Sequence, residues 1–309
     1  MIRTQIEDKA LLEHLESLPD DTREVFLIAN GEIRLSAVGT TRIVNQMRAN
    51  HKTGLVETYV LGQGYTAGAL LSSEVKGNDR IQLTIECSGP IGGLNIEAWA
   101  CGAVRGYIVN NPIPLSEPLK SLDTSPLYGP GFLTITKILE GSKTPFSGQI
   151  MLEYGHLAQD LALYYQISEQ TPSLFSLSIY FDKEGRVLGS GGLMMQALPE
   201  CPEDVLTSLQ NDSTTLSNMG KWISEGKTVE EYVENSFSKY GVQHLSHAPI
   251  GFSCPCNEKN FENYLVNLPQ KEKDEILKGE FPLVLQCFNC GTEYKFSKSK
   301  LEELFSEGK

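Results

Sequence analysis

The sequence predicts an α+β protein with a mixed core domain of antiparallel sheets and packed helices, a helical linker and a small C-terminal domain. The chain has 309 residues, more than one ordinary domain, and 40% of them are hydrophobic, which is enough for a sizeable core. Short segments of alternating polarity between residues 80 and 109 are separated by glycine-containing turns, as is typical of antiparallel strands. Four of the seven cysteines lie in the last fifth of the chain, which sets that part apart.

The first elements of the core domain, which we expect over residues 1–198, are a hairpin and two helices. Apolar runs lie on both sides of Asn30-Gly31, the strongest short-range signal for a β-hairpin. A helix with a threonine at its N-cap is expected over residues 40–51. A second helix is expected over residues 64–77, because this stretch is rich in small residues and ends at a glycine.

The rest of the core domain is expected to form a meander, one more strand, a helix and a second hairpin. The meander follows from three alternating segments joined by short turns, which is not the pattern of strands linked by crossover helices. The expected elements are strands at 80–87, 92–100, 103–109 and 132–139, a helix at 157–168, and a hairpin at 174–196 that turns on residues 182–185.

The character of the sequence changes at Pro199. Residues 199–250 are polar, weakly amphipathic and rich in Ser, Thr, Asn and Glu, which predicts short helices with modest apolar faces. Because such a segment has low local stability, we interpret it as a helical, metastable linker. Trp222, one of the two tryptophans, is expected to anchor a helix of this linker against another surface.

The composition argues against several classes of protein. The formal net charge of −13 disfavours a nucleic-acid partner, and residues 251–309 hold eight Lys, no Arg and ten Asp or Glu. No apolar run approaches the roughly 18–20 residues that span a bilayer, so no membrane partner is expected. The N-terminus is charged throughout and lacks the apolar core of a signal peptide. We therefore expect a cytoplasmic protein.

Motifs of the common enzyme classes are missing from the sequence. Its glycine-rich pieces match neither G-x-G-x-x-G nor G-x4-G-K-[ST], so turns and tight packing explain them better than a phosphate site. The five histidines form no H-E-x-x-H pair, and there is no G-x-S-x-G nucleophile elbow. His244 and His247 are candidates for spare metal ligands near the cysteines. The sequence therefore predicts that the protein is not an enzyme.

Two cysteine pairs dominate the C-terminal domain, which we expect over residues 251–309. Cys254 and Cys256 form a C-x-C motif, and Cys287 and Cys290 form a C-x2-C motif after thirty intervening residues. Tetrahedral Zn2+ takes four soft ligands at about 2.3 Å, and two such pairs supply them when the chain between them folds back. That chain has the pattern of two helices and a strand, and a second strand follows. The spacing therefore predicts one Zn2+ in a small zinc-binding domain.

The spacing leaves the role of this zinc open. A unit of 59 residues buries little core, so a structural zinc, worth about 10–16 kcal/mol, would decide whether it folds. Zinc-bound sulfur is also the oxidisable thiolate, so oxidation to two disulfides would expel the metal. A dithiol oxidoreductase is a third interpretation, but it gives Cys254 and Cys256 no role. Cys87, Cys101 and Cys201 are scattered, which fits a reducing compartment and predicts buried or incidental thiols.

Several strings along the chain follow one another in the order of a known family. They are GALLSSEVKGNDRIQLTIECSGPIGGL, AVRGYIVNNP, GPGFLTITKIL, LAQDLALYYQISEQTPS and the C-x-C…C-x2-C end. The chain thereby resembles the bacterial thirty-three-kilodalton heat-shock chaperone, the redox-regulated holdase, from about residue 25 to its end. Cys87 and Cys101 depart from the family pattern in the core meander, where extra thiols would oxidise off-pathway.

The resemblance implies a core, a linker and a C-terminal zinc redox switch. In the reduced, inactive protein Cys254, Cys256, Cys287 and Cys290 would bind one Zn2+. Oxidation would form the Cys254–Cys256 and Cys287–Cys290 disulfides, release the zinc and unfold the linker. The active protein, often a homodimer, would then hold unfolding client proteins without ATP.

The expected function is thus a redox-regulated, ATP-independent holdase chaperone that acts under oxidative and heat stress. The first alternative is a zinc-stabilised interaction module that does not switch. A thiol oxidoreductase is the weaker alternative, since it would use only one of the two cysteine pairs.

Overall fold

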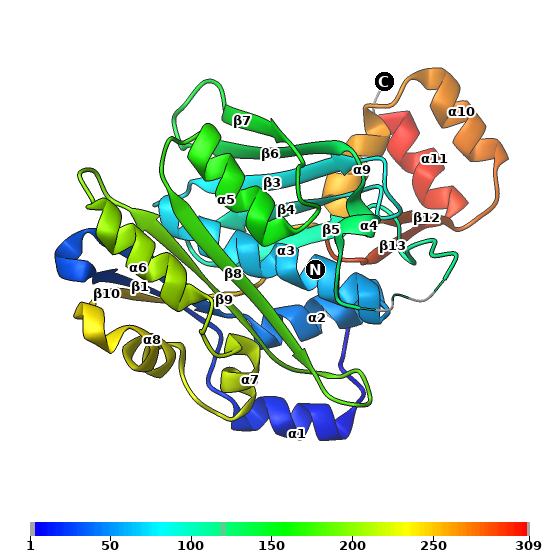
Figure 1. Cartoon of the computed structure of the whole chain (residues 1–309). Helices are drawn as coiled ribbons and strands as arrows, with labels where there is room; N and C mark the ends of the chain where they lie inside the picture. Colours follow the sequence, from blue (N-terminus) through cyan, green and yellow to red (C-terminus); the bar gives the residue numbers. More distant parts are fainter. Residues whose placement is uncertain (1–3, 118, 120, 308–309) are drawn as a thin grey trace.

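Two mainly antiparallel sheets with a helix between them form the core of the protein (Figure 1). The computed structural model describes residues 4–117, 119 and 121–307. Helix α3 (Leu55–Leu71) lies between the sheets and contacts strands of both. A two-stranded sheet with three helices forms a separate C-terminal unit, drawn in orange and red beside the six-stranded sheet.

The five-stranded sheet has the order β10-β1-β2-β9-β8, and all neighbours are antiparallel. Both predicted hairpins lie in it and are confirmed, β1–β2 around Asn30 and β8–β9 around the turn after Phe181. Asn30 has a φ of 54°, a left-handed conformation that asparagine tolerates better than most residues. The strands are β1 (Thr22–Ile28), β2 (Ile33–Gly39), β8 (Ser173–Phe181), β9 (Val187–Ala197) and β10 (Gln243–Pro249).

The six-stranded sheet has the order β11-β5-β4-β3-β6-β7 and contains the predicted meander β3–β4–β5 and the predicted strand β6. The edge strand β7 is not predicted, because its exposed Phe146 and Met151 break the usual polar alternation. The strands are β3 (Arg80–Cys87), β4 (Gly93–Trp99), β5 (Ala103–Ile108), β6 (Gly131–Ile138), β7 (Phe146–Met151) and β11 (Gly251–Phe252), which pairs in parallel with β5.

The prediction for helix α3 is wrong in its bounds. The helix begins at Leu55 rather than at residue 64, and it ends at Leu71 before a 3-10 turn. It is buried on nearly all sides between the two sheets, so it has no polar face that would mark its start. Its glycines allow close approach to the strands, since a Cβ on Gly68 would lie 2.6 Å from the side chain of Ile96.

Helix α2 (Thr41–His51) confirms the other early helix, with Thr40 at its N-cap. The cap is supplied by a different side chain, because the carboxylate of Asp21 accepts the N–H groups of Arg42 and Ile43 at 3.1 and 2.8 Å. The remaining helices of the core are α1 (Lys9–Ser17), α4 (Ser125–Tyr128) and α5 (Leu157–Ile167), of which the sequence predicts α5.

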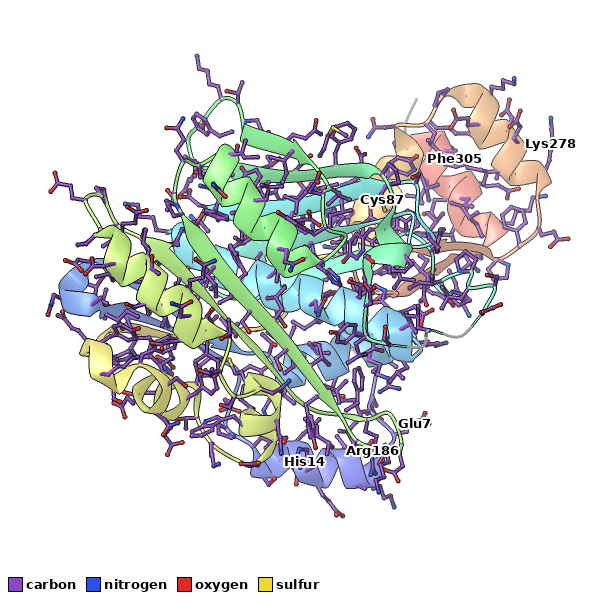
Figure 2. The ribbon with its side chains drawn as sticks, in the orientation of Figure 1. Glu7, His14, Cys87, Arg186, Lys278 and Phe305 are labelled. Atoms are coloured by element: carbon purple, nitrogen blue, oxygen red, sulfur yellow. The ribbon has the colours of Figure 1, made fainter. Side chains whose placement is uncertain are left out.

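Helix α1 docks on the β8–β9 hairpin, where Figure 2 shows His14 and Arg186 near each other. Nε2 of His14 lies 2.8 Å from the carbonyl oxygen of Leu188, and the guanidinium of Arg186 lies 3.9 Å from the carboxylate of Asp8. The buried leucines of this region form a small apolar cluster of their own. The N-terminal helix therefore lies against the core without extending its main apolar cluster.

Three short helices and strand β10 make up most of the predicted linker. The helices are α6 (Glu203–Ser213), α7 (Met219–Ser224) and α8 (Val229–Phe237). Helices are predicted here, but strand β10 is not. Trp222 packs edge-on against Tyr232, with ring centroids 5.7 Å apart, and its Nε1 donates to the carbonyl oxygen of Thr228 at 3.0 Å. It thus anchors α7 to α8.

The apolar faces of α6, α7 and α8 pack on the five-stranded sheet in one group of side chains, which we call the linker cluster. Its buried members are Phe26, Ile28, Ala29, Ile33, Leu35, Ala37, Leu193, Met195, Leu209, Met219, Ile223, Val229, Tyr232, Val233 and Phe237. About half of them belong to the sheet, so the helices depend on it for burial.

The C-terminal unit has the predicted pattern of helices and strands. Its elements are α9 (Glu258–Val266), α10 (Gln270–Lys278), β12 (Leu283–Gln286), β13 (Glu293–Phe296) and α11 (Lys298–Glu307), of which α11 is not predicted. The domain boundaries after residues 198 and 250 stay predictions. On the two sides of the second boundary, β10 belongs to the five-stranded sheet and β11 to the six-stranded sheet. Within the described part of the chain, every helix is too short or too polar to span a bilayer.

Candidate metal centre

The four predicted cysteines come together in the structure. Their sulfur atoms all lie within 4.8 Å of one another, and all four side chains are buried. Sγ of Cys254 lies 3.8 Å from Sγ of Cys287, and Sγ of Cys256 lies 3.3 Å from Sγ of Cys290. The first pair follows strand β11 and the second lies between β12 and β13, so the intervening helices bring the two motifs together.

A tight turn shapes the second motif. The N–H of Gly291 donates to the carbonyl oxygen of Cys287 at 2.8 Å, and the N–H of Cys287 donates to that of Thr292 at 2.9 Å. Gly291 has a φ of +69°, the left-handed region that glycine adopts without strain. After the first motif, Asn257 caps helix α9 through the N–H of Asn260 at 3.0 Å. Local structure thus fixes the chain beside each cysteine pair.

The geometry of the cluster suits a tetrahedral metal ion. Ligands at about 2.3 Å from a central Zn2+ stand about 3.8 Å apart, close to the sulfur separations across the two motifs. Four sulfur donors are the set that soft or borderline ions prefer. Among the described residues this is the one group of three or more His, Cys, Asp or Glu whose ligand atoms converge in this way. The four cysteines can therefore hold a metal ion, and zinc fits them.

Hydrogen-bond donors from outside the motifs reach the sulfurs. Nη1 of Arg105 donates to Sγ of Cys254 at 3.4 Å, and the hydroxyl of Tyr294 donates to Sγ of Cys256 at 3.2 Å. The thiols of Cys287 and Cys290 and the guanidinium of Arg105 outweigh burial and lower the pKa of Cys254. Burial raises the pKa of Cys256 to about 11. One sulfur of the cluster is thus strongly favoured as thiolate, and bringing the others to that state calls for positive charge.

The cluster lies where the C-terminal unit meets the core. The carbonyl oxygen of Asn50, at the end of α2, lies close to the turn between Cys287 and Gly291. A Cβ on Gly291 would stand 2.3 Å from this oxygen. The next residue, His51, is half-buried there, and burial lowers its pKa. Phe288, 75% exposed, packs on Tyr107 of β5 with centroids 5.7 Å apart. The site therefore joins two parts of the molecule as well as two sequence motifs.

The other candidate ligands lie elsewhere. Nε2 of His244 and Nδ1 of His247 bind the two carboxylate oxygens of the buried Glu24 at 2.9 and 2.7 Å, which fastens β10 to β1. The structure places neither histidine in the cysteine cluster.

The three scattered cysteines lie apart from the cluster. Cys87 and Cys201 are half-buried, and burial raises the pKa of each thiol. Cys101 is exposed in the turn between β4 and β5. Of the two expectations, a buried or an incidental thiol, the exposed turn leaves the second for Cys101.

Two residues of the site escape prediction from the sequence. Tyr294 lies in a predicted strand, four residues after Cys290, so the sequence pattern could have placed it close to the second motif. Arg105 gives no such signal, since it is separated from Cys254 by 149 positions and sits in a strand that alternates in the usual way.

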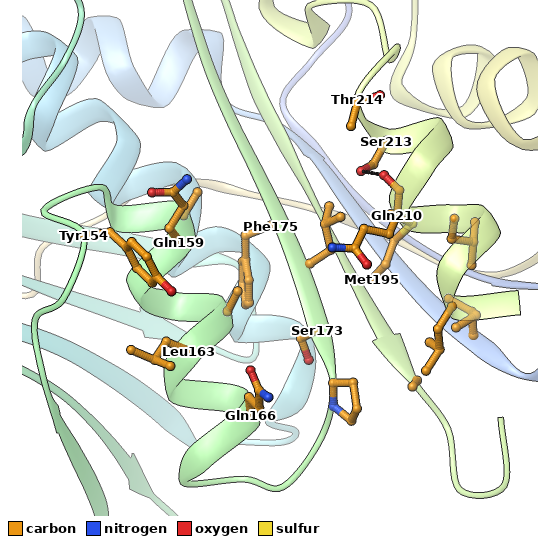
Figure 3. A pocket seen from close by; sticks show the side chains of 18 residues that line it. Tyr154, Gln159, Leu163, Gln166, Ser173, Phe175, Met195, Gln210, Ser213 and Thr214 are labelled. Carbon is orange, nitrogen blue, oxygen red and sulfur yellow. Dashed lines mark hydrogen bonds between the residues drawn. The ribbon is translucent and has the colours of Figure 1, made fainter. Parts of the chain in front are cut away.

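A cavity of about 660 Å³ lies between α5 and α6, over strands β8 and β9 (Figure 3). Its lining residues are Ile33, Tyr154, Ala158, Gln159, Ala162, Leu163, Gln166, Pro172, Ser173, Leu174, Phe175, Met195, Ala197, Leu206, Leu209, Gln210, Ser213 and Thr214. None of these lining residues is charged or a histidine or cysteine, so the cavity offers neither an acid–base pair nor a strong nucleophile. It adds no second chemical site to the cysteine cluster.

Comparison with known proteins gives a consistent result. The family model described as Hsp33 protein matches residues 21–297. A 33 kDa chaperonin of Lachnoclostridium phytofermentans is 34% identical over 280 residues, which cover 90% of this chain and 96% of that protein. A 33 kDa chaperonin of Desulforamulus reducens is 34% identical over 277 residues, covering 89% and 94%. The crystal structure of the 33 kDa chaperonin from Thermotoga maritima is similar with a TM-score of 0.84 at 28% identity, covering 94% of this chain and 99% of that one.

Proposed function

The chain belongs to the Hsp33 protein family, and we propose that it is a redox-regulated, ATP-independent holdase chaperone that binds unfolding proteins under oxidative and heat stress. The relatives are named 33 kDa chaperonin, which supports a chaperone role rather than an enzymatic one. The observation that carries the proposal is the meeting of four buried cysteine sulfurs within 4.8 Å, in a chain of this family.

In the reduced protein, Cys254, Cys256, Cys287 and Cys290 hold one zinc ion. The ion supplies the positive charge that lets four neighbouring sulfurs remain thiolates. The four sulfurs fasten the start and the end of the C-terminal unit to one point. Arg105 and Tyr294 orient two of them through their hydrogen bonds.

Oxidation converts the four sulfurs into two disulfides. In each step two thiolates lose two electrons and one S–S bond forms, while one hydrogen peroxide takes up those electrons and two protons from solvent, its O–O bond breaks and two waters leave. The family resemblance assigns the pairs Cys254–Cys256 and Cys287–Cys290. All four sulfurs lie within 4.8 Å of one another, so both pairs are within reach once the sulfurs move to bonding distance. Mass spectrometry of peptides from the oxidised protein tests the pairing.

Loss of the sulfur cluster acts on the linker through strands β10 and β11. These strands end directly before Cys254 and hold residues 243–252 on the two core sheets. When they detach, α6, α7 and α8 are no longer followed by a strand that is fixed to the core. The apolar side chains of the linker cluster then reach solvent. Exposed apolar groups on flexible chain then bind unfolded client proteins.

The proposal places the protein in the cytoplasm, where thiols stay reduced until stress. Its active form is a homodimer, in line with the family resemblance, and its partners are unfolded or partly unfolded proteins. Size-exclusion chromatography of the oxidised form tests the dimer. Neither nucleic acid nor membrane is a partner.

The decisive experiment follows zinc and client aggregation together. Hydrogen peroxide is added at a heat-shock temperature, zinc release is read with a chromogenic chelator, and light scattering reports the aggregation of a thermally unfolding client. We expect zinc release and suppression of aggregation to appear together, and dithiothreitol to reverse both. Retained zinc, or released zinc without suppression, contradicts the proposal and favours a zinc-stabilised module that does not switch.

Two further readouts separate the alternatives. A thiol oxidoreductase would reduce insulin disulfides catalytically, and we expect no such turnover. The emission of Trp222 should shift to the red on oxidation, because its packing between α7 and α8 is lost when the linker unfolds. The variant Trp99→Phe isolates this signal, since the chain has two tryptophans.

A further inference from the structure

The side chain of Arg105 connects the six-stranded sheet to the cysteine cluster. Nη1 donates to Sγ of Cys254 at 3.4 Å. Nε donates at 2.7 Å to Oε2 of Glu97, the residue opposite on β4. The guanidinium also lies over the ring of Trp99, 5.1 Å from its centroid. Three groups therefore hold this cation at the point where the chain leaves the core for the cysteines.

Arg105 and Glu97 form an ion pair with little access to water. Each side chain is 14% exposed. Burial opposes the charge of Arg105, but Cys254 and Glu97 outweigh it and raise the pKa of Arg105 above its usual value. A partly buried cation of this kind depends on its anionic partners. When one partner loses its charge, the guanidinium is held by the anion that remains.

The backbone just before Cys254 pairs with β5, the strand that carries Arg105. Strand β11 pairs in parallel with Ala103 and Val104, and the N–H of Ser253 donates to the carbonyl oxygen of Val104 at 3.1 Å. Strand β10 comes directly before β11 and pairs with β1 in the other sheet. A side chain that holds Cys254 in place therefore also holds the end of residues 243–252.

Oxidation removes the charge that Arg105 meets at Cys254. When the thiolates of Cys254 and a second cysteine form an S–S bond, two electrons pass to hydrogen peroxide, which takes two protons from solvent and becomes two waters. A disulfide sulfur is neutral and a weak hydrogen-bond acceptor, whereas a thiolate forms a charge-assisted bond. Arg105 then keeps Glu97 and Trp99 as partners and loses its bond to the cysteine motif.

We propose that Arg105 is a positioning residue that couples the oxidation state of Cys254 to the pairing of residues 243–252 with the two core sheets. This inference rests on the proposed function, because it requires that Cys254 is oxidised under stress. In the reduced protein Arg105 holds the sulfur and, with it, β11. In the oxidised protein the guanidinium stays with Glu97, and β11 and β10 are free to detach.

Hydrogen exchange of the full-length protein tests this role. Mass spectrometry measures the exchange rates of peptides covering residues 243–252 in the reduced and the oxidised form, and their ratio reports the coupling. In Arg105→Met, which keeps an unbranched apolar stem but removes the charge and the hydrogen-bond donors, we expect the ratio to fall about tenfold. Arg105→Lys keeps the charge and should retain part of the ratio. A merely structural role would speed exchange equally in both forms, so an unchanged ratio in Arg105→Met overturns the inference.

A second variant keeps the test valid if Arg105→Met does not fold. Glu97→Gln retains a hydrogen-bond acceptor but removes the competing anion, so Arg105 depends more on Cys254. We expect the exchange ratio to rise in Glu97→Gln, and a ratio equal to that of the wild type contradicts the coupling.

Trp99 supplies a spectroscopic signature of the same event. In Trp222→Phe it is the remaining tryptophan, and its emission should change on oxidation because the guanidinium over its ring loses the negatively charged partner at Cys254. The combined variant Trp222→Phe with Arg105→Met should lack this change, and a change of the same size overturns the inference. A wild type that neither releases zinc nor changes its exchange on oxidation refutes the proposed function itself. A wild type that switches while the variants keep its ratio refutes only the role of Arg105.

Discussion

The C-terminal unit and the linker helices differ in the source of their stability. The C-terminal unit has a small apolar core of its own, made by Leu265, Phe296, Leu301 and Phe305, and the four cysteines lie at its junction with the core domain. Helices α6, α7 and α8 have no separate core, since their buried side chains all belong to the linker cluster on the five-stranded sheet.

This difference indicates that the two regions respond to different changes. The C-terminal unit depends on a point at its edge where four sulfurs meet, so sulfur chemistry acts on it directly. The linker helices depend on the five-stranded sheet, which carries none of the four cysteines. Residues 243–252 pair with both sheets and connect this region to Cys254.

Removal of one sulfur should unfold the C-terminal unit and leave most of the two core sheets folded. In Cys290→Ser we expect loss of bound zinc and of the hydrogen-exchange protection of residues 258–307, because structural zinc contributes about 10–16 kcal/mol to the folding of such units. The strands of the two core sheets should stay protected, apart from β10 and β11, which lie next to the cluster. Zinc analysis and exchange mass spectrometry measure both effects. The matched control is Cys201→Ser, which removes a thiol far from the cluster. Full zinc content with a protected unit in Cys290→Ser contradicts the comparison.

Truncation of a buried linker side chain should release the linker alone. Phe237 is fully buried in the linker cluster, so Phe237→Ala should cost about 3–5 kcal/mol of docking free energy. We expect faster proteolysis within residues 199–250 and partial suppression of client aggregation without oxidant, while zinc stays bound. Phe146→Ala, at a position that is 59% exposed, serves as the control. Zinc loss in Phe237→Ala would show that the two regions are not independent.

The core carries its own pH dependence, which must be separated from both regions. Burial raises the pKa of Asp21, the cap of α2, from 3.8 to about 7. Between these values the folded protein retains a proton that the unfolded chain has lost, so the free energy of unfolding falls as the pH rises and levels off above pH 7.

The size of this effect follows from the linkage of proton binding to folding. Compared with Asp21→Asn, the wild type should lose on the order of 2–3 kcal/mol between about pH 5 and pH 7, since each unit is worth about 1.4 kcal/mol. Urea denaturation at several pH values measures the difference. The control is Asp20→Asn, because the carboxylate of Asp20, next to Asp21 in the chain, is 90% exposed. Equal pH profiles for the wild type and Asp21→Asn contradict the expectation.

The contact between the turn at Gly291 and the end of α2 should contribute the least to the free energy of unfolding. Gly291 and Gly241 have similar φ values of +69° and +67°, so alanine is strained at both. A Cβ meets the carbonyl oxygen of Asn50 at 2.3 Å only at Gly291, whereas nothing lies within 4 Å at Gly241. Gly291→Ala should therefore cost about 1–2 kcal/mol more than Gly241→Ala. Chemical denaturation followed by exchange at residues 258–307 measures this excess, and equal costs would mean that the contact is unimportant.

The sequence predicts local elements well where their signals are local. Asn30-Gly31 specifies a hairpin because few residues adopt the left-handed turn, and the alternation over 80–109 specifies strands because successive side chains point to opposite faces. The bounds of α3 are mispredicted because both of its faces are buried, and strand β10 is missed because its side chains are mostly exposed on an edge strand. These features depend on the partners that surround a segment.

The sequence by itself determines that four cysteines stand in two pairs at a spacing that suits one metal ion, because ligand chemistry and a short separation along the chain are sequence properties. Only the tertiary structure decides what surrounds the sulfurs. Arg105 reaches Cys254 across 149 positions, and Asn50 lies under Gly291, through the packing of a sheet and a helix. Such contacts carry no pattern in the sequence, because they follow from how distant elements meet.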